Sequence, residues 1–136
     1  MKEILNQFSL DIEYKALISG VSEGRIPAVV SGICDSARPF FVASVLNDVK
    51  KKGIVIVSGE KEAYAVAEAL RLFYDKVFCY PSRDFVFENV TAYSREWEHE
   101  RLSVQYAVAN DDYDIIVTVP EALRRNMGCD VIRPAE

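Results

Sequence analysis

The chain has 136 residues, a formal net charge of −5 at pH 7 and a hydrophobic fraction of 50%. This length suits one domain with a sizeable core, and the acidic balance argues against broad, non-specific binding of nucleic acid. No apolar run approaches membrane-spanning length and the first residues do not resemble a signal peptide, so we expect a cytoplasmic protein with no membrane partner.

Residues 1–27 are predicted to form a helical lead-in to the domain. From Leu10 onward the apolar residues recur at the spacing of an amphipathic helix, which we expect to end near Gly20 or Gly24. A short apolar run rich in β-branched residues follows and predicts a first, buried strand at residues 29–31.

A small, polar turn at residues 31–36 leads from this strand into a helix predicted from about residue 36 to residue 52. Strand, tight turn and helix N-terminus together form the architecture of a phosphate cradle, because free N–H groups at a helix start attract anions. Against the P-loop pattern G-x-x-x-x-G-K-[ST], Gly32 fills the first position, but Ala37, Arg38 and Pro39 occupy the last three. We interpret the turn as a degenerate phosphate loop that holds no nucleotide. The alternative is an ordinary strand-to-helix turn.

The three substitutions act on different parts of the cradle. The Ala37 methyl stands where phosphate must approach the backbone, and Pro39 lacks the hydroxyl that binds Mg²⁺. The Arg38 guanidinium replaces a compact ammonium, and this change alone is compatible with phosphate binding.

Residues 50–80 predict two more strands with a helix between them. The lysines at 50–52 suit the C-terminus of a helix, with a phosphate-binding patch as the alternative, and Gly53 is expected to end that helix. The run at 54–57 is apolar throughout, as in strands covered on both faces. Ser58 is the predicted N-cap of the next helix, and residues 77–80 form the third predicted strand.

The last third of the chain predicts a helix, a strand and a short helix. Ser94 is expected to cap the long helix, and the fourth strand is predicted at residues 115–117. Thr118 to Glu121 fits a capping box for a helix through Arg125. Alternating strands and helices predict a three-layer parallel α/β sheet. We expect one domain over residues 1–128, with 129–136 as an exit segment toward a following domain.

Signatures of catalysis are missing from the sequence. It has no G-x-S-x-G elbow, no H-E-x-x-H and no dinucleotide fingerprint. His99 is the only histidine and lies among charges, which predicts a solvated position. Three widely separated cysteines, at positions 34, 79 and 129, predict neither a disulfide framework nor a zinc site.

The irregular segment after the third strand is the most informative loop. It leaves the carboxyl end of a strand, the edge at which α/β proteins build their sites. Its aromatic and acidic residues are Phe85, Phe87, Asp84 and Glu88. These residues either dock a partner or pack the loop onto its own sheet. With Arg38 and Arg101 they form the candidate interdomain or partner contact.

Several of these segments, taken in order, resemble the N-terminal, UvrB-like region of bacterial transcription-repair coupling factors (Mfd). The turn at residues 31–40 resembles that family's degenerate Walker A motif, and Tyr80-Pro81 with Asp84 and Phe87-Glu88 resembles its aromatic-Pro-x-x-Asp loop. The other matching segments are 60–63, 70–73, 100–102 and 116–123. The resemblance covers almost the whole chain and depends on the order and spacing of the set.

The resemblance implies a P-loop-NTPase-like fold, similar to UvrB domain 1a, with a degenerate Walker A. It implies a longer protein, an ATP-dependent DNA translocase that displaces stalled RNA polymerase and recruits UvrA in nucleotide-excision repair. DNA, RNA polymerase, UvrA and the other domains would be the partners. This chain would be the first, non-catalytic subdomain without a cofactor, and ATP and Mg²⁺ would belong to the downstream motor. Between Phe87 and the Ser94 helix there is no room for the damage-probing β-hairpin of UvrB, so damage verification is not expected.

Two other classes of function stay open at this stage. One is a small nucleotide-binding α/β enzyme with an unorthodox phosphate loop, in which Arg38 binds the phosphate. The other is an interaction domain unrelated to repair. Titration with ATP separates the first from the rest, and capture by UvrA separates a repair protein from a generic interaction domain.

Overall fold

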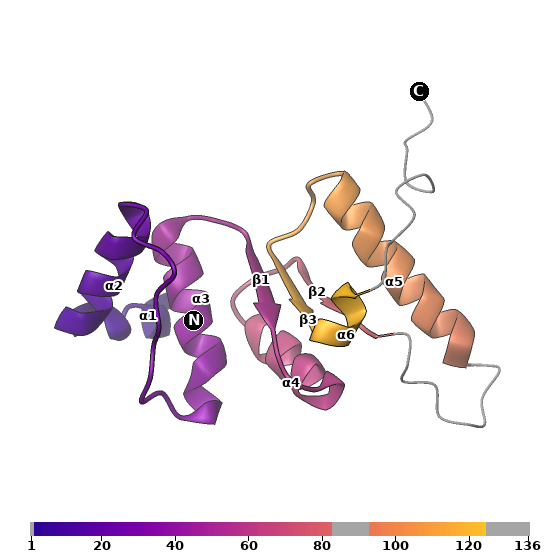
Figure 1. Ribbon diagram of the computed structural model, residues 1–136, viewed down its shortest axis with the longest axis horizontal. Helices are drawn as coiled ribbons and strands as arrows, with labels where there is room; N and C mark the ends of the chain where they lie inside the picture. Colours follow the sequence, from indigo (N-terminus) through magenta and orange to yellow (C-terminus); the bar gives the residue numbers. More distant parts are fainter. Residues whose placement is uncertain (1, 83–92, 125–136) are drawn as a thin grey trace.

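The structure, a computed structural model, describes residues 2–82 and 93–124, without the side chains of residues 2 and 93–98. Its longer helices are α2 (Ile12–Ser22), α3 (Arg38–Val49), α4 (Glu60–Leu70) and α5 (Tyr93–Ala109), and its strands are β1 (Gly53–Ile56), β2 (Val77–Tyr80) and β3 (Ile115–Thr118) (Figure 1). Two single-turn helices, α1 (Lys2–Leu5) and α6 (Pro120–Leu123), and two 3₁₀ turns, η1 (Phe8–Leu10) and η2 (Asp35–Ala37), complete the described elements.

The three described strands form one parallel sheet in the order β1-β3-β2. Ile116 of β3 lies in register with Ile54 on one side and with Phe78 on the other. All four residues of β3 are buried, as expected for a central strand of a parallel sheet. Parallel pairing of three of the four predicted strands is therefore confirmed, and the chain is an α/β protein.

Helices lie against both faces of this sheet. The α4 helix packs against β2 and β3 through three fully buried residues, Ala63, Ala67 and Leu70. The α5 helix packs against β2, where the Arg101 guanidinium stacks on the ring of Tyr80. The register places Tyr80 on the same face as Ile56, whereas Val55 and Val57 point the other way and line a cleft with α4.

The predicted strand at residues 29–31 is wrong. Residues 25–34 have neither helix nor strand, and Val29 is 95% exposed. A β-branched run becomes a strand only where a neighbouring strand takes up its N–H and C=O groups. In the described ranges β1 pairs with β3 alone, and residues 30–33 face β1 across an open cleft. Local propensity alone therefore does not make residues 29–31 a strand.

Several predicted helix boundaries also need correction. Gly59, not Ser58, is the N-cap of α4, because the Ser58 hydroxyl donates instead to Glu62 Oε2 at 2.9 Å. Thr118 belongs to β3 and donates its hydroxyl proton to the Tyr80 carbonyl at 3.0 Å, so Val119 takes the N-cap position of α6.

Two further boundary differences concern α3 and α5. The α3 helix ends at Val49 because Lys50 adopts a left-handed conformation with φ 56°, and Gly53 is instead the first residue of β1. The α5 helix begins at Tyr93, so Ser94 lies inside it. The amphipathic helix of the lead-in is confirmed as α2, capped by the Asp11 carboxylate. The exit segment at 129–136 lies outside the described residues.

Candidate functional site

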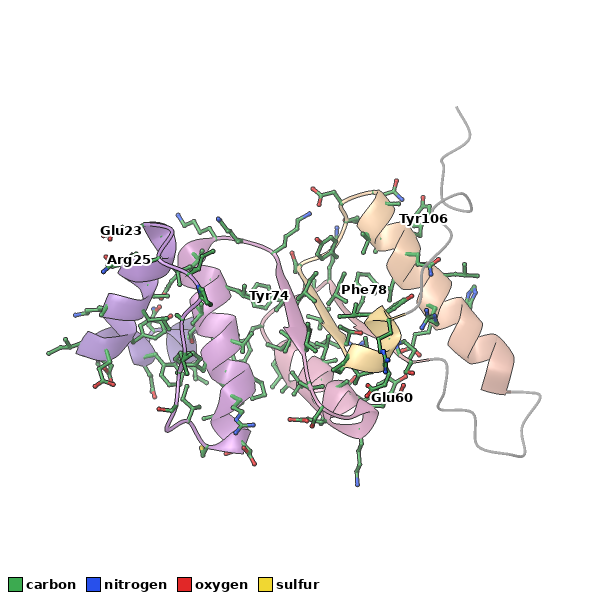
Figure 2. All side chains as sticks on the ribbon, in the orientation of Figure 1. Glu23, Arg25, Glu60, Tyr74, Phe78 and Tyr106 are labelled. Carbon is green, nitrogen blue, oxygen red and sulfur yellow. The ribbon has the colours of Figure 1, made fainter. Side chains whose placement is uncertain are left out.

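The carboxyl ends of β1 and β2 lie beside the first turn of α4, where Glu60 points toward the end of β2 (Figure 2). Glu60 Oε1 accepts the backbone N–H of Ser82 at 2.6 Å, and Ser82 is buried. Burial raises the pKa of the Glu60 carboxyl, and the nearby Glu100 and Glu121 raise it further, whereas the Ser82 N–H opposes them. This hydrogen bond fixes the start of the loop that follows β2.

Arg101 of α5 holds the same stretch of chain from the other side. Its Nη1 donates to the Pro81 carbonyl at 2.6 Å and its Nη2 to the Tyr80 hydroxyl at 2.5 Å. The guanidinium also lies 4.3 Å from the centroid of the Tyr80 ring, within the range of a cation–π interaction. We call Glu60, Tyr80, Pro81, Ser82 and Arg101 the loop anchor. The planar guanidinium of an arginine can stack on a ring and donate several hydrogen bonds at once, which suits this position better than the ammonium of a lysine would.

Two other titratable side chains near the loop anchor, Tyr64 and Cys79, have raised pKa values and so keep their protons at neutral pH. The Tyr64 hydroxyl donates to Glu100 Oε2 at 3.1 Å, and burial raises the pKa of that tyrosine. Burial also raises the pKa of the Cys79 thiol to about 12. A thiol must lose its proton to act as a nucleophile, so Cys79 is a core residue. Among residues 2–82 and 93–124 no group of histidine, cysteine and carboxylate side chains could hold a metal ion.

The turn that was predicted to be a degenerate phosphate loop lies across a cleft from β1 and α4. Gly32 has φ 81°, a left-handed conformation with open space where a Cβ would stand. The N-cap of α3 is Ala37, which makes no side-chain cap, and Pro39 follows in the first turn without an N–H. The Arg38 guanidinium pairs with the Asp35 carboxylate at 2.9 Å. A carboxylate therefore stands beside the one cation of the loop, where a phosphate would need to bind.

Cys34, in the same turn, is exposed. The Ser36 hydroxyl and the Ala37 N–H lower the pKa of its thiol through hydrogen bonds. The sequence offers no partner base for this cysteine, and its environment is one of local turn hydrogen bonds.

A cleft of about 1150 Å³ separates the degenerate phosphate loop from the sheet. Gly32 and Arg38 line one wall, β1 forms the other, and Ser58 and Glu62 lie at its end. Ala37 lines a second cavity of about 640 Å³, between this loop and α2. The Arg38 cleft and the loop anchor thus flank the first turn of α4 at the carboxyl edge of the sheet.

The predicted contact residues are only partly placed by the structure. Arg38 and Arg101 lie in the two separate groups just described, while Asp84, Phe85, Phe87 and Glu88 fall outside the described residues. His99 is exposed, as its charged neighbours predicted. Sequence analysis missed the role of Glu60, because its place in the first turn of a helix already explained a carboxylate there. The nearest signal was its membership, with Arg101, in the segments that carry the family resemblance.

The fold and these groups define an α/β domain with a parallel sheet and a polar loop anchor at its strand ends. The chain is 28% identical over 115 residues to the transcription-repair-coupling factor of Bacillus subtilis (strain 168), a match that covers 83% of this chain and 10% of that protein. The chain is therefore distantly related to that factor and spans about a tenth of its length. No family model and no solved structure matches the chain. None of the described helices is long and apolar enough to cross a membrane.

Proposed function

We propose that the chain is a non-catalytic docking module of a transcription-repair coupling protein. The 115-residue match to the Bacillus factor is the observation that carries this proposal. In the longer protein, a DNA translocase would displace stalled RNA polymerase and recruit UvrA, and this chain would correspond to the first part of its UvrB-like region. The module would contact the other domains of that protein through the carboxyl edge of its sheet.

The local chemistry supports a module without a reaction of its own. The Arg38 guanidinium is paired with Asp35 at 2.9 Å, so a phosphate entering the loop would meet a carboxylate as well as a cation. Pro39 offers neither an N–H nor a hydroxyl, and Cys79 is a protonated core thiol. The rival hypothesis, an enzyme that binds nucleotide through Arg38, would require that ion pair to open.

Capture by UvrA tests the proposal. We would immobilise UvrA and compare the 136-residue chain with the protein made from its complete native reading frame. The complete protein should be retained and the 136-residue chain should pass through, because the family resemblance implies that the UvrA contact lies in a segment after this one. RNA polymerase, tested the same way, should show the same contrast. A complete protein that folds but is retained by neither partner would contradict a role in transcription-coupled repair.

A further inference from the structure

The outer edge of β1 is unpaired and apolar in the described part of the chain. Gly53 and Val57 donate their N–H groups to β3, at Asp114 and Thr118. In a parallel strand alternate residues direct their backbone groups to opposite sides, so the N–H and C=O groups of Ile54 and Ile56 point away from the sheet. Their side chains are 62% and 55% exposed. No lysine, proline or bulge protects this edge, as such devices do in edge strands that stay unpaired.

The space beside this edge is a lined cleft. It runs along Val55, Ile56 and Val57 on the sheet side and reaches residues 30–33 on the far side. Phe41, Val42 and Val66 add apolar side chains to its walls. From strand spacing and layer thickness, one residue of a packed strand needs about 160 Å³. The cleft of about 1150 Å³ therefore has room for a strand as long as β1.

We propose that this cleft receives a β-strand from polypeptide outside these 136 residues, which hydrogen-bonds to Ile54 and Ile56 and extends the sheet. The occupant is an extended run of Val, Ile or Leu, because it meets isoleucine side chains on one face and α3 and α4 on the other. The related Bacillus factor is about ten times as long as the match, so a longer chain has strands to supply.

Residues 28–31 of the chain itself are the competing occupant. Two observations favour a strand from elsewhere. The chain is held three residues to either side of this segment: the Arg25 N–H donates to the Gly20 carbonyl at 2.8 Å, and the Ala37 N–H donates to the Cys34 carbonyl at 3.0 Å. The cleft also includes Phe41 and Val42 of α3, a helix that is packed against α4. Moving residues 28–31 alone would leave that side unfilled.

Amide hydrogen exchange tests the proposal on unmodified protein. In the 136-residue chain, Ile54 and Ile56 amides should exchange at least tenfold faster than Val55 and Val57 amides, which face β3. In the protein made from the complete native reading frame, the two isoleucine amides should slow at least tenfold. Slow isoleucine amides already in the 136-residue chain would mean that a segment of this chain covers the edge, and would overturn the proposal. Equal, fast exchange in both proteins, or a reading frame that stops at Glu136, would also overturn it.

Thiol alkylation gives an independent measure, in a background with Cys34→Ser and Cys129→Ser. Ile54→Cys should react with iodoacetamide at least tenfold more slowly in the complete protein than in the 136-residue chain. Ile12→Cys, at a position 82% exposed on α2, is the matched control and should react equally in both. The proposal shares with the proposed function only the premise of a longer chain. Protection of Ile54 without UvrA capture would refute the function alone, and capture without protection would refute the added strand alone.

Discussion

The sheet region and the N-terminal region of the molecule are built very differently. Residues 53–82 and 99–124 supply most of the buried core, including Leu70, Ile115 and Val117, which are fully buried. In residues 3–50, by contrast, large apolar side chains such as Leu10 and Ile12 are 82% exposed. Burial of apolar surface is the main stabilising term in folding. The sheet region therefore holds most of the apolar burial, and the N-terminal region joins the same core through Leu5 and Ala43.

Helix α3 makes that attachment by packing against α4. The Tyr74 hydroxyl donates to the Ala43 carbonyl at 3.1 Å between α3 and the sheet (Figure 2). Phe40 and Phe73 meet edge to face at 5.5 Å. Within the N-terminal region, Phe8, Tyr14 and Phe41 form an aromatic cluster of their own. The difference shows that one domain can contain a well-packed core beside a region in which large apolar side chains stay exposed.

Truncation in the sheet core should have the largest effect. Leu70→Ala removes a fully buried side chain and should lower the free energy of unfolding by about 2–5 kcal/mol. Leu72→Ala, two residues later and 53% exposed, is the matched control and should cost less than about 0.5 kcal/mol. Urea unfolding of both variants measures the difference. Similar losses in the two would mean that burial does not distinguish these positions.

Loosening the attachment should have an intermediate and regional effect. Tyr74→Phe removes only the hydroxyl bound to the Ala43 carbonyl and should cost about 0.5–1.5 kcal/mol. Amide exchange should accelerate in α3 while β3 amides keep their protection. Tyr106→Phe, at a position 70% exposed on α5, should change neither. If α3 and β3 lost protection equally, the two regions would be one cooperative unit.

The smallest effect should come from Glu60 and should depend on pH. Burial raises the pKa of this carboxyl in the folded state, so the folded state binds its proton more readily than the unfolded state does. Stability from this group is therefore greatest below its unfolded pKa and declines as pH rises toward the folded value. Glu60→Gln keeps an oxygen acceptor for the Ser82 N–H but cannot ionise. The stability of the variant relative to the native protein should therefore increase as pH rises from about 4. Melting temperatures of both proteins, measured at a series of pH values, test this. A difference between the two that stays constant with pH would contradict it.

Sequence analysis predicted the sheet where local pattern and tertiary burial agree. The apolar runs that became β2 and β3 lie where most of their side chains are covered, and each of the three strands pairs with a neighbour. The run that became β1 was predicted to be covered on both faces, and this part is wrong, because Ile54 and Ile56 are 62% and 55% exposed. Residues 29–31 carry the same pattern, but pairing is a property of two segments and cannot be read from one. The capping errors have a related cause, because Ser58 and Thr118 had other hydrogen-bond partners, Glu62 and the Tyr80 carbonyl.

The candidate site was predictable only in part. Topology predicts that the loop after β2 lies at the carboxyl edge of the sheet, but Arg101 lies in the middle of α5, so its place beside Pro81 depends on how that helix packs against β2. Its stacking on Tyr80 and the bond from Ser82 to Glu60 depend on how α4 and α5 pack, which no spacing in the sequence encodes. The pairing of Arg38 with Asp35 could have been predicted from the sequence, because residues three apart are neighbours on a helical turn.

Calorimetric titration of the 136-residue chain with Mg-ATP tests most directly the claim that this is a docking module without a nucleotide site. The account predicts no saturable heat up to millimolar nucleotide, because Asp35 occupies the Arg38 guanidinium and Pro39 gives the Mg²⁺ no ligand. Asp35→Asn, which frees Arg38, is the matched variant and should bind at most weakly. A dissociation constant in the micromolar range for the native chain, weakened by Arg38→Ala, would contradict the account and establish a working phosphate loop.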